Sequence, residues 1–175
     1  MGDNIIHLKS YSLSRNFEIS TSNTEYVHYG DIHTTNKKYV DQGVALPNIK
    51  SGDYECLKTG DLVLADASED YKEIAEPLLM KNIDGRNVVS GLHTIAIRLK
   101  CGDPLFYLYL FLSPEFRHYV YKVGTGLKVF GINYDKVGKY VSYFPKNIEQ
   151  KNIGKLLFIL DKLIAANQPF PATAK

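Results

Sequence analysis

Two histidines and an aspartate near the N-terminus have the types and spacing of a metal site. They are His28, Asp31 and His33 in the stretch YVHYGDIHT, residues 26–34. A catalytic zinc ion needs three protein ligands that converge on one point. The stretch matches no strongly patterned metal motif such as H-E-x-x-H, and Gly-Asp is typical of a turn in which Asp bonds its own backbone. We expect a turn between two strands and no metal ligand; a small hydrolase or metalloenzyme using these three residues is the alternative.

A glycine-rich stretch, VGTGLKVFG at residues 123–131, is the second candidate site. A dinucleotide-binding fingerprint must follow a strand and open a helix, whereas this stretch follows a predicted helix and contains no G-K-[ST]. We therefore discount nucleotide binding. Lys122, Thr125 and Lys128 suit contact with a phosphate backbone. The other interpretation of the stretch is a tight turn that needs positive φ.

Polar turns supply further candidate binding residues. In the turn at residues 84–87, Arg86 could read guanine and Asn87 could read adenine through paired hydrogen bonds in the major groove. Lys58 and Lys72 are further candidates. For each of them the alternative is an ordinary surface position.

The charge along the chain favours an anionic partner. The formal net charge is +2, but residues 53–76 hold eight acids against two bases, and residues 117–155 hold eight bases against two acids. A basic half fits a face that binds a polyanion, because each neutralised phosphate releases counterions. A solvated lysine-rich surface explains the same charge.

Other classes of protein find little support in the sequence. There is no G-x-S-x-G elbow, and no pair of the five histidines is spaced to suggest a catalytic triad, so we expect neither catalysis nor a cofactor. Cys56 and Cys101 lie far apart and indicate neither a disulfide framework nor a zinc knuckle. No apolar run reaches the roughly 18–20 residues of a membrane helix, and no signal-peptide pattern is present, so we expect a cytoplasmic protein.

The elements that must position these residues are β-rich at first. The run Leu62–Ala65 predicts a strand, and residues 85–100 predict two strands around Ser90-Gly91. A buried helix is expected from about Pro104 to Val120, broken or kinked at Pro114. Residues 123–145 are too rich in glycine for a helix and predict a loop followed by short strands.

A long amphipathic helix is expected at residues 147–168. Asn147 could cap it, with Gln150 completing a capping box. Its apolar residues form a stripe at coiled-coil-like spacing. The members of the stripe are Ile153, Leu157, Leu160 and Ile164.

Four stretches, in this order, resemble a known family. They are YVHYGDIHT, LKTGDLVLADASEDYKEIAEP, VVSGLHTIAIRLK and the segment from FLSPEFRHY to LDKLI. From about Tyr26 to Ile164 the chain resembles the target recognition domain of the DNA specificity (S) subunit of type I restriction-modification systems. The resemblance implies a mixed α+β (α/β) fold, compact and with a mostly β core, followed by a coiled-coil-type helix. The implied parts are a recognition domain at 1–146, a helix at 147–168 and a tail at 169–175.

The resemblance also implies a function. Such a domain reads one half of a split site in double-stranded DNA, together with methyltransferase (M) and restriction (R) subunits, and has no catalysis of its own. The sequence contains neither an Asn/Asp-Pro-Pro-aromatic methyltransferase motif nor a P-D…E-x-K nuclease arrangement.

The chain departs from the family in having one recognition domain where an S subunit has two. Its last helix spans about 20 residues, roughly 30 Å, where the family's helix continues. A half-subunit, a cut chain and a truncated cassette product without active partners all fit this pattern. A short helix with an exposed apolar stripe should seek a partner, so we expect a homodimer through Ile153, Leu157, Leu160 and Ile164.

Overall fold

A five-stranded sheet forms the centre of the molecule. The computed structural model describes residues 1–35, 37–126 and 128–167. The strand order is β1-β10-β6-β8-β4, antiparallel except for the parallel pair of β4 and β8. The strands are β1 (Ile5–Leu8), β10 (Thr94–Leu99), β6 (Leu62–Ala65), β8 (Pro77–Met80) and β4 (Tyr39–Val40). The strand predicted at Leu62–Ala65 is therefore confirmed, and it lies in the middle of the sheet.

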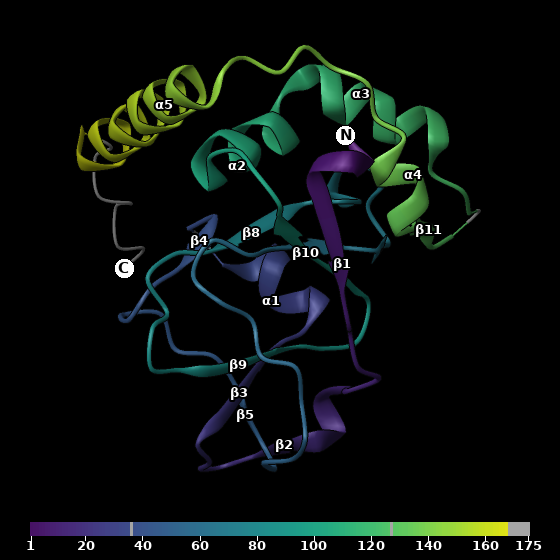
Figure 1. Cartoon of the computed structure of the whole chain (residues 1–175). Coiled ribbons are helices and arrows are strands. Elements are labelled where there is room, and N and C mark those ends of the chain that lie inside the picture. Colours follow the sequence, from purple (N-terminus) through teal and green to yellow (C-terminus); the bar gives the residue numbers. More distant parts are fainter. Residues whose placement is uncertain (36, 127, 168–175) are drawn as a thin grey trace, which may run out of the picture.

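A second, four-stranded sheet lies below the first in Figure 1, with the order β2-β5-β3-β9. Its strands are β2 (Glu18–Ile19), β5 (Asn48–Ile49), β3 (Thr24–Val27) and β9 (Asn87–Ser90). β3 and β9 run parallel, while β5 pairs antiparallel with both β2 and β3. The two strands predicted around Ser90-Gly91 are β9 and β10, and they belong to different sheets.

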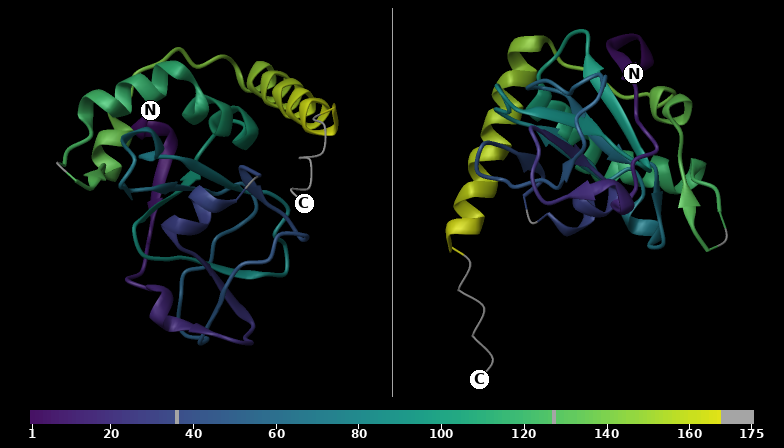
Figure 2. Two further views of the ribbon diagram at one scale, coloured as in Figure 1. Left: turned by 180° about the vertical axis from the view of Figure 1, so that it is seen from behind. Right: turned by 90° about the horizontal axis from the view of Figure 1, so that it is seen from below.

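Helices cover the other side of the five-stranded sheet (Figures 1 and 2). α2 (Pro104–Leu112) and α3 (Pro114–Val123) occupy the region of the predicted helix and separate at Pro114, as expected. Asp103 accepts from the Phe106 N–H over 3.0 Å and Ser113 from the Phe116 N–H over 3.3 Å, so each helix has its own side-chain cap. The remaining short elements are β7 (Ala67–Ser68), β11 (Phe130–Gly131), α1 (Tyr29–Thr34), α4 (Tyr134–Gly138) and the 3-10 turns η1 (Gly2–Asn4), η2 (Arg15–Phe17) and η3 (Tyr71–Glu73).

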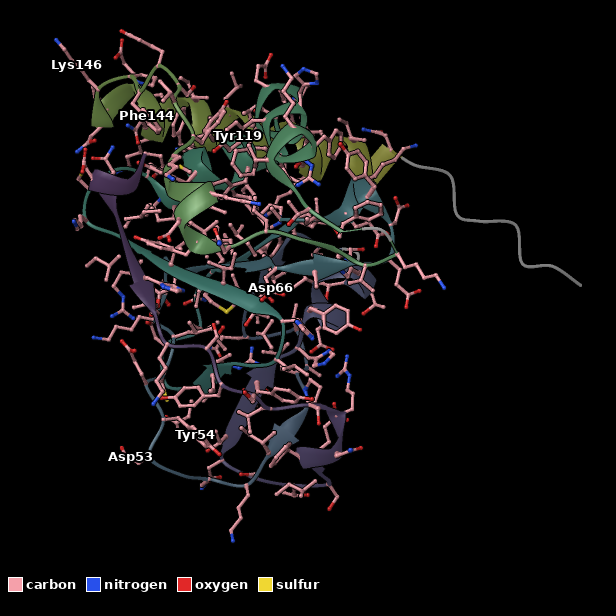
Figure 3. All side chains as sticks on the ribbon, turned by 90° about the vertical axis from the view of Figure 1, so that its right-hand side faces the viewer. Asp53, Tyr54, Asp66, Tyr119, Phe144 and Lys146 are labelled. Carbon is pink, nitrogen blue, oxygen red and sulfur yellow. The ribbon has the colours of Figure 1, made fainter. Side chains whose placement is uncertain are left out.

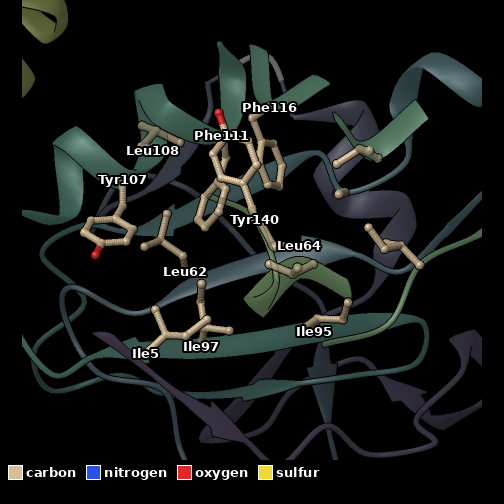
Figure 4. Close-up of a cluster of buried hydrophobic side chains, with 14 of the residues drawn as sticks. Ile5, Leu62, Leu64, Ile95, Ile97, Tyr107, Leu108, Phe111, Phe116 and Tyr140 are labelled. Carbon is tan, nitrogen blue, oxygen red and sulfur yellow. The ribbon is translucent and has the colours of Figure 1, made fainter. Parts of the chain in front are cut away.

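The core has two main parts, one on each face of the five-stranded sheet. On the helical side, Leu62, Leu64 and Ile97 pack against Phe111 and Phe116 (Figure 4). On the other side, a second cluster joins the sheet to α1 and the lower sheet; it includes Val27, Ile32, Val63, Ala65, Val88 and Ala96. Each buried Val, Leu, Ile or Phe side chain of these clusters contributes about 1.5–3 kcal/mol by leaving water. The alternation in residues 92–99 predicts a strand with one face more apolar than the other. Both faces are buried at Thr94–Ile97, because each faces a layer of the protein.

The long C-terminal helix α5 (Asn147–Asn167) packs along α2. Its contact face is narrow, because only Gln150 and Gly154 are buried. The two helices approach closely at Gly154, where a Cβ would lie 2.6 Å from the Phe106 nitrogen. The predicted capping box of Asn147 and Gln150 is wrong. Glu149 accepts from the Lys146 N–H over 2.9 Å, while buried Gln150 accepts from the Asp103 N–H over 3.1 Å and so ties α5 to the start of α2.

The predicted class is confirmed as a mixed α+β globule with a mostly β core and a C-terminal helix. α4 departs from the prediction, because the glycine-rich segment was expected to continue as short strands. Asn133 caps α4 by accepting from the Lys136 N–H. Among the helices of the described residues, none is long and apolar enough to cross a membrane.

Candidate nucleic-acid interface

The glycine-rich stretch forms a closed loop between α3 and β11. The Thr125 N–H donates to the Gly131 carbonyl over 3.0 Å, and the Gly131 N–H donates back to the Thr125 carbonyl over 2.8 Å. Gly126 has a φ of 143°, and a Cβ there would lie 1.9 Å from the Val129 carbonyl oxygen. Only glycine fits this backbone. The loop is thus a tight turn with positive φ, and it has a fixed closing pair.

The side chains predicted to contact phosphates are available on this loop. Lys122 lies in the last turn of α3, and Lys122, Thr125 and Lys128 are all exposed. No acidic residue occurs between positions 122 and 131. Two ammonium groups without a nearby acid in sequence are suited to contact a phosphate backbone.

Lys72 joins this loop from a distant part of the chain. Its carbonyl accepts from the Arg117 guanidinium over 2.6 Å, which fixes η3 against α3. The Tyr71 ring lies 4.7 Å from the Tyr121 ring and 5.0 Å from the Phe130 ring. We refer to Lys72, Lys122, Thr125 and Lys128 as the loop group. Tertiary packing thus brings together four of the seven residues predicted to bind DNA.

A polar groove adjoins the loop group. It consists of two hollows of about 620 and 340 Å³ that share Asp66, Ile132 and Asn133. The side that holds Asp66 is the one that faces the viewer in Figure 3. Thr125 lines the smaller hollow, so the groove reaches the loop group. The other lining residues with polar side chains are His7, Lys9, Ser10, Glu55, Thr94, Tyr134, His93 and Lys136.

The groove presents aromatic rings and groups that form hydrogen bonds. The His7 ring stacks on the Tyr134 ring with centroids 4.2 Å apart and an angle of 3° between the planes. Ser10 and Thr94 line the groove; Ser10 shares a hydrogen bond of 2.9 Å with buried Ser90, which shares one of 2.6 Å with Thr94. Donors and acceptors in fixed positions are what direct readout of base edges requires.

Two acidic side chains line the groove, Glu55 and Asp66, and Asp66 is the one shared by both hollows. Burial raises the pKa of its carboxyl, and the nearby His93 opposes that rise through its charge and a contact of 3.1 Å between Nδ1 and Oδ1. His93 has a φ of 57°, in the left-handed region that non-glycine residues rarely adopt. This pair could not be recognised from the sequence, because the two residues lie at the ends of separate strands. The signal that could have found them is their position directly after β6 and directly before β10.

The other three predicted DNA contacts lie elsewhere. Lys58 lies close to the turn that holds Arg86 and Asn87. The neighbouring Thr59 hydroxyl donates to the Asp84 carboxylate of that turn over 2.9 Å. These residues lie by the start of β6, whereas Asp66 and the loop group lie at its end. The structure therefore does not bring all seven predicted residues to one place.

Arg86 is held inside the protein by four hydrogen bonds. Nε and Nη2 donate to the two carboxylate oxygens of Glu25 over 2.8 and 2.7 Å, and the Asp41 and Val44 carbonyls accept over 2.6 and 2.9 Å. Its side chain is 12% exposed and that of Glu25 21%. A base edge would have to displace the acceptors that already satisfy these four donors. Asn87 is exposed and donates to the Asn23 carbonyl over 3.0 Å, and Lys58 is exposed.

The stretch that suggested a metal site starts a helix. His28 follows β3 as the N-cap of α1, and its Nδ1 accepts from the Gly30 N–H over 3.2 Å. The Asp31 carboxylate accepts from the His28 N–H over 2.8 Å, which completes a capping box. The predicted turn between two strands is therefore wrong.

His28, Asp31 and His33 do not converge on a metal ion. The Tyr29 ring lies beside both imidazoles, with centroids 4.4 Å from His28 and 6.0 Å from His33. Asp31 also accepts from Arg15, and His33 Nδ1 lies 3.0 Å from the Glu76 carboxylate. Among the residues that the structure describes, no group of three His, Cys, Asp or Glu side chains could hold a metal ion. This geometry contradicts the alternative of a metalloenzyme built on these residues.

The stripe on α5 is largely exposed. Ile153, Leu160 and Ile164 are 38–58% exposed, and Leu157 is half-buried. Leu156, Ile159 and Leu163 widen the same apolar surface. The helix contacts α2 at Gly154 and Gln150 and through the hydrogen bond from Tyr109 to Asp161, and it leaves most of its large apolar side chains uncovered among the described residues.

Comparison with solved structures identifies a similar fold. The type I restriction-modification system S subunit from M. genitalium matches over 92% of this chain with a TM-score of 0.59 and 12% sequence identity. The chain has the fold of part of an S subunit. It spans 37% of the length of that S subunit. No family model matches the sequence, and no curated protein matches it.

Proposed function

We propose that the chain recognises a sequence in double-stranded DNA as the specificity subunit, or half-subunit, of a type I restriction-modification enzyme. The observation that carries the proposal is the S-subunit fold along 92% of the chain. The loop group and the polar groove support it, because they combine basic side chains with fixed donors and acceptors on one side of the molecule.

The proposed division of labour follows from the chemistry of each part. Lys72, Lys122 and Lys128 would contact phosphates, which set the register of the protein on the duplex without reading its sequence. His7, Asn133 and Asp66 in the groove would face base edges, where hydrogen bonds distinguish one base pair from another. The polar groove is an addition to the residues predicted from the sequence.

Within this proposal the chain breaks no bond and holds no cofactor. Methylation and cleavage would belong to the M and R subunits. The stripe on α5 gives such an assembly a surface, which could pair with the same helix of a second copy or with an M subunit. The competing hypothesis is that the chain is the product of a truncated cassette and has no active partners.

The salt dependence of duplex binding tests the role of the loop group. Each phosphate contact that is lost lowers the slope of log K against log salt by about 0.9 for duplex DNA. The double variant Lys122→Ala, Lys128→Ala should therefore lower the slope by about two, measured by fluorescence anisotropy with a labelled duplex of random sequence. Lys100→Ala is the control, because Lys100 is exposed beyond the far end of β10. A slope that stays the same in the double variant would refute the assignment.

Co-purification tests the assembly. The chain, expressed with the cognate M subunit, should retain that subunit through an affinity tag on the chain. A chain that binds DNA and retains no M subunit would support the truncated cassette instead.

A further inference from the structure

A second groove lies on the helical side of the molecule, where α2, α5 and the start of β4 meet. It has a volume of about 430 Å³. Figure 1 shows these three elements next to one another. Its lining residues are Lys37, Lys38, Tyr39, Leu108, Tyr109, Phe158, Asp161, Lys162, Ile164 and Ala165. We refer to it as the lysine-rimmed groove.

Two aromatic rings in this groove are surrounded by ammonium groups. The Tyr39 and Phe158 rings meet edge to face with centroids 5.4 Å apart. Lys81 Nζ lies 5.5 Å from the Tyr39 centroid and 5.1 Å from that of Phe158, Lys37 Nζ lies 5.6 Å from Tyr39, and Lys162 Nζ lies 4.8 Å from Phe158. Such cation–π contacts hold an ammonium group near the negative face of a ring. They gather three positive charges around one apolar surface.

These three charges have no carboxylate partner inside the described part of the chain. The ion pairs found there do not include Lys37, Lys81 or Lys162. The two other charged groups in the groove are engaged, because Lys38 pairs with Glu76 and Asp161 accepts from the Tyr109 hydroxyl over 2.7 Å. An incoming anion would therefore displace no internal ion pair of the three lysines.

The geometry points to an acidic amphipathic segment of a partner protein as the occupant of the lysine-rimmed groove. Apolar side chains of that segment would enter between Tyr39, Phe158 and Ile164, and its carboxylates would meet Lys37, Lys81 and Lys162. Opposite charge at the rim and apolar contact at the centre are the usual arrangement of a protein interface. This site does not depend on the proposal for DNA.

Two other occupants fit the groove less well. A single-stranded nucleic acid binds by stacking its bases on open aromatic faces, and ammonium groups already lie over the Tyr39 and Phe158 rings. A second copy of α5 carries three lysines (Lys151, Lys155 and Lys162) and two acids (Glu149 and Asp161). It would therefore add net positive charge to a positive rim.

The lysine-rimmed groove is continuous with the stripe on α5. Ile164 lines the groove and is also a member of the stripe. A partner that covers the stripe would therefore reach the groove with an adjacent segment. This continuity favours a protein occupant over a small anion.

Charge reversal with a matched peptide pair tests the proposal. The probes are a labelled helical peptide of about four turns with Leu on one face and Glu on its flanks, and the same peptide with Lys in place of Glu. The triple variant Lys37→Glu, Lys81→Glu, Lys162→Glu should bind the acidic peptide at least about tenfold more weakly than the unmodified chain does, and should bind the basic peptide better. The variant Lys146→Glu, Lys151→Glu, Lys155→Glu carries the same change in charge outside the groove and should keep its affinity for the acidic peptide.

Several outcomes would overturn the proposal. The first is that the unmodified chain does not bind the acidic peptide. The second is that both triple variants bind the acidic peptide equally weakly. The third is that an oligothymidylate displaces the peptide from the unmodified chain and binds the groove variant more weakly. A dimer mass in light scattering that falls to the monomer mass only in the groove variant would instead assign the groove to self-association. Thermal melting of both variants shows whether either is unfolded, and so whether a loss of affinity follows from unfolding.

Discussion

At the scale of single residues, Arg86 joins three segments that are far apart in the sequence. Its guanidinium holds the Glu25 carboxylate of β3 and the carbonyls of Asp41 and Val44. The bond to Glu25 has the paired geometry that makes Arg-carboxylate interactions strong. The sequence pointed to a base contact because a turn of polar residues looks exposed, and the partner that occupies Arg86 is 61 positions away.

We expect Arg86→Ala to destabilise the fold by about 3 kcal/mol, because it leaves the Glu25 carboxylate partly buried without its partner. The midpoint of urea unfolding measures this change. Lys58→Ala is the control and should change the stability by no more than about 0.5 kcal/mol, since Lys58 is exposed. An unchanged midpoint in Arg86→Ala, with weaker DNA binding, would return Arg86 to the residues that read bases.

His28 predicts a dependence of stability on pH. Burial, followed by the positive charge of Arg15, lowers the pKa of its imidazole in the folded protein. The unfolded chain therefore takes up the proton first, and stability should fall as the pH drops below about 6.5, the ordinary value. This loss ends once the pH is below the folded pKa.

The variant His28→Asn tests that dependence, because Asn is a good N-cap and does not titrate. The free energy of unfolding should fall less between pH 7.5 and pH 5 in the variant than in the unmodified chain, by denaturant titration at each pH. Equal pH dependence of the two proteins would contradict the role given to His28.

At the scale of elements, the close backbone approach of α5 to α2 depends on one glycine. A Cβ at Gly154 would lie 2.6 Å from the Phe106 nitrogen and 2.8 Å from an Asp103 carboxylate oxygen. The two backbones approach closely here, and the larger side chains of α5 point elsewhere. This explains why the helix can be docked and still keep an apolar surface exposed.

We expect Gly154→Ala to destabilise the protein, although Ala favours an isolated helix by about 1 kcal/mol over Gly. The steric cost of overpacking, about 1–3 kcal/mol, outweighs that gain. Thermal unfolding measures the sum, and the exposed neighbour Lys155→Ala serves as the control, since it adds helix propensity without a clash. A rise in melting temperature in Gly154→Ala would show that α5 does not need this contact.

The elements that the sequence predicted well carry their signals locally. Asp103-Pro104 and Ser113-Pro114 each place a cap before a proline, so both α2 and α3 could be located from neighbouring residues. α1 was missed because it is only six residues long and contains a glycine, and its capping box uses a histidine as the N-cap. Helix signals of that kind are weak without the tertiary contacts of Ile32.

The candidate site divides in the same way. The loop at residues 122–131 could be found from its composition, since its lysines and glycines are consecutive. The groove beside it could not, because His7, Asp66, His93 and Asn133 come from four separate segments. Their proximity depends on how β1, β10 and the loop pack, and the period of a single strand does not specify that.

At the scale of the whole molecule, the exposed stripe on α5 predicts association. The unmodified chain should have twice the monomer mass of 19.8 kDa in light scattering at high concentration. Leu160→Asp should restore the monomer mass with little loss of stability, because Leu160 is 44% exposed. Lys155→Asp is the control, since Lys155 lies about 140° away around the helix.

A monomer mass for the unmodified chain at every concentration would contradict self-association. The stripe would then remain available to an M subunit, and Leu160→Asp should reduce the amount of that subunit retained in co-purification.

The position of β1 in the sheet bears on how the chain folds as it is synthesised. β1 pairs with β10, whose residues follow about ninety positions later, and the Tyr134 hydroxyl bonds the Ile5 carbonyl from 129 positions away. Contacts between such distant residues carry a large loop-closure cost and slow folding. β1 must therefore wait, with Ile5 and Leu8 lacking these partners, until β10 and Tyr134 have emerged from the ribosome. During that interval chaperones have access to this strand.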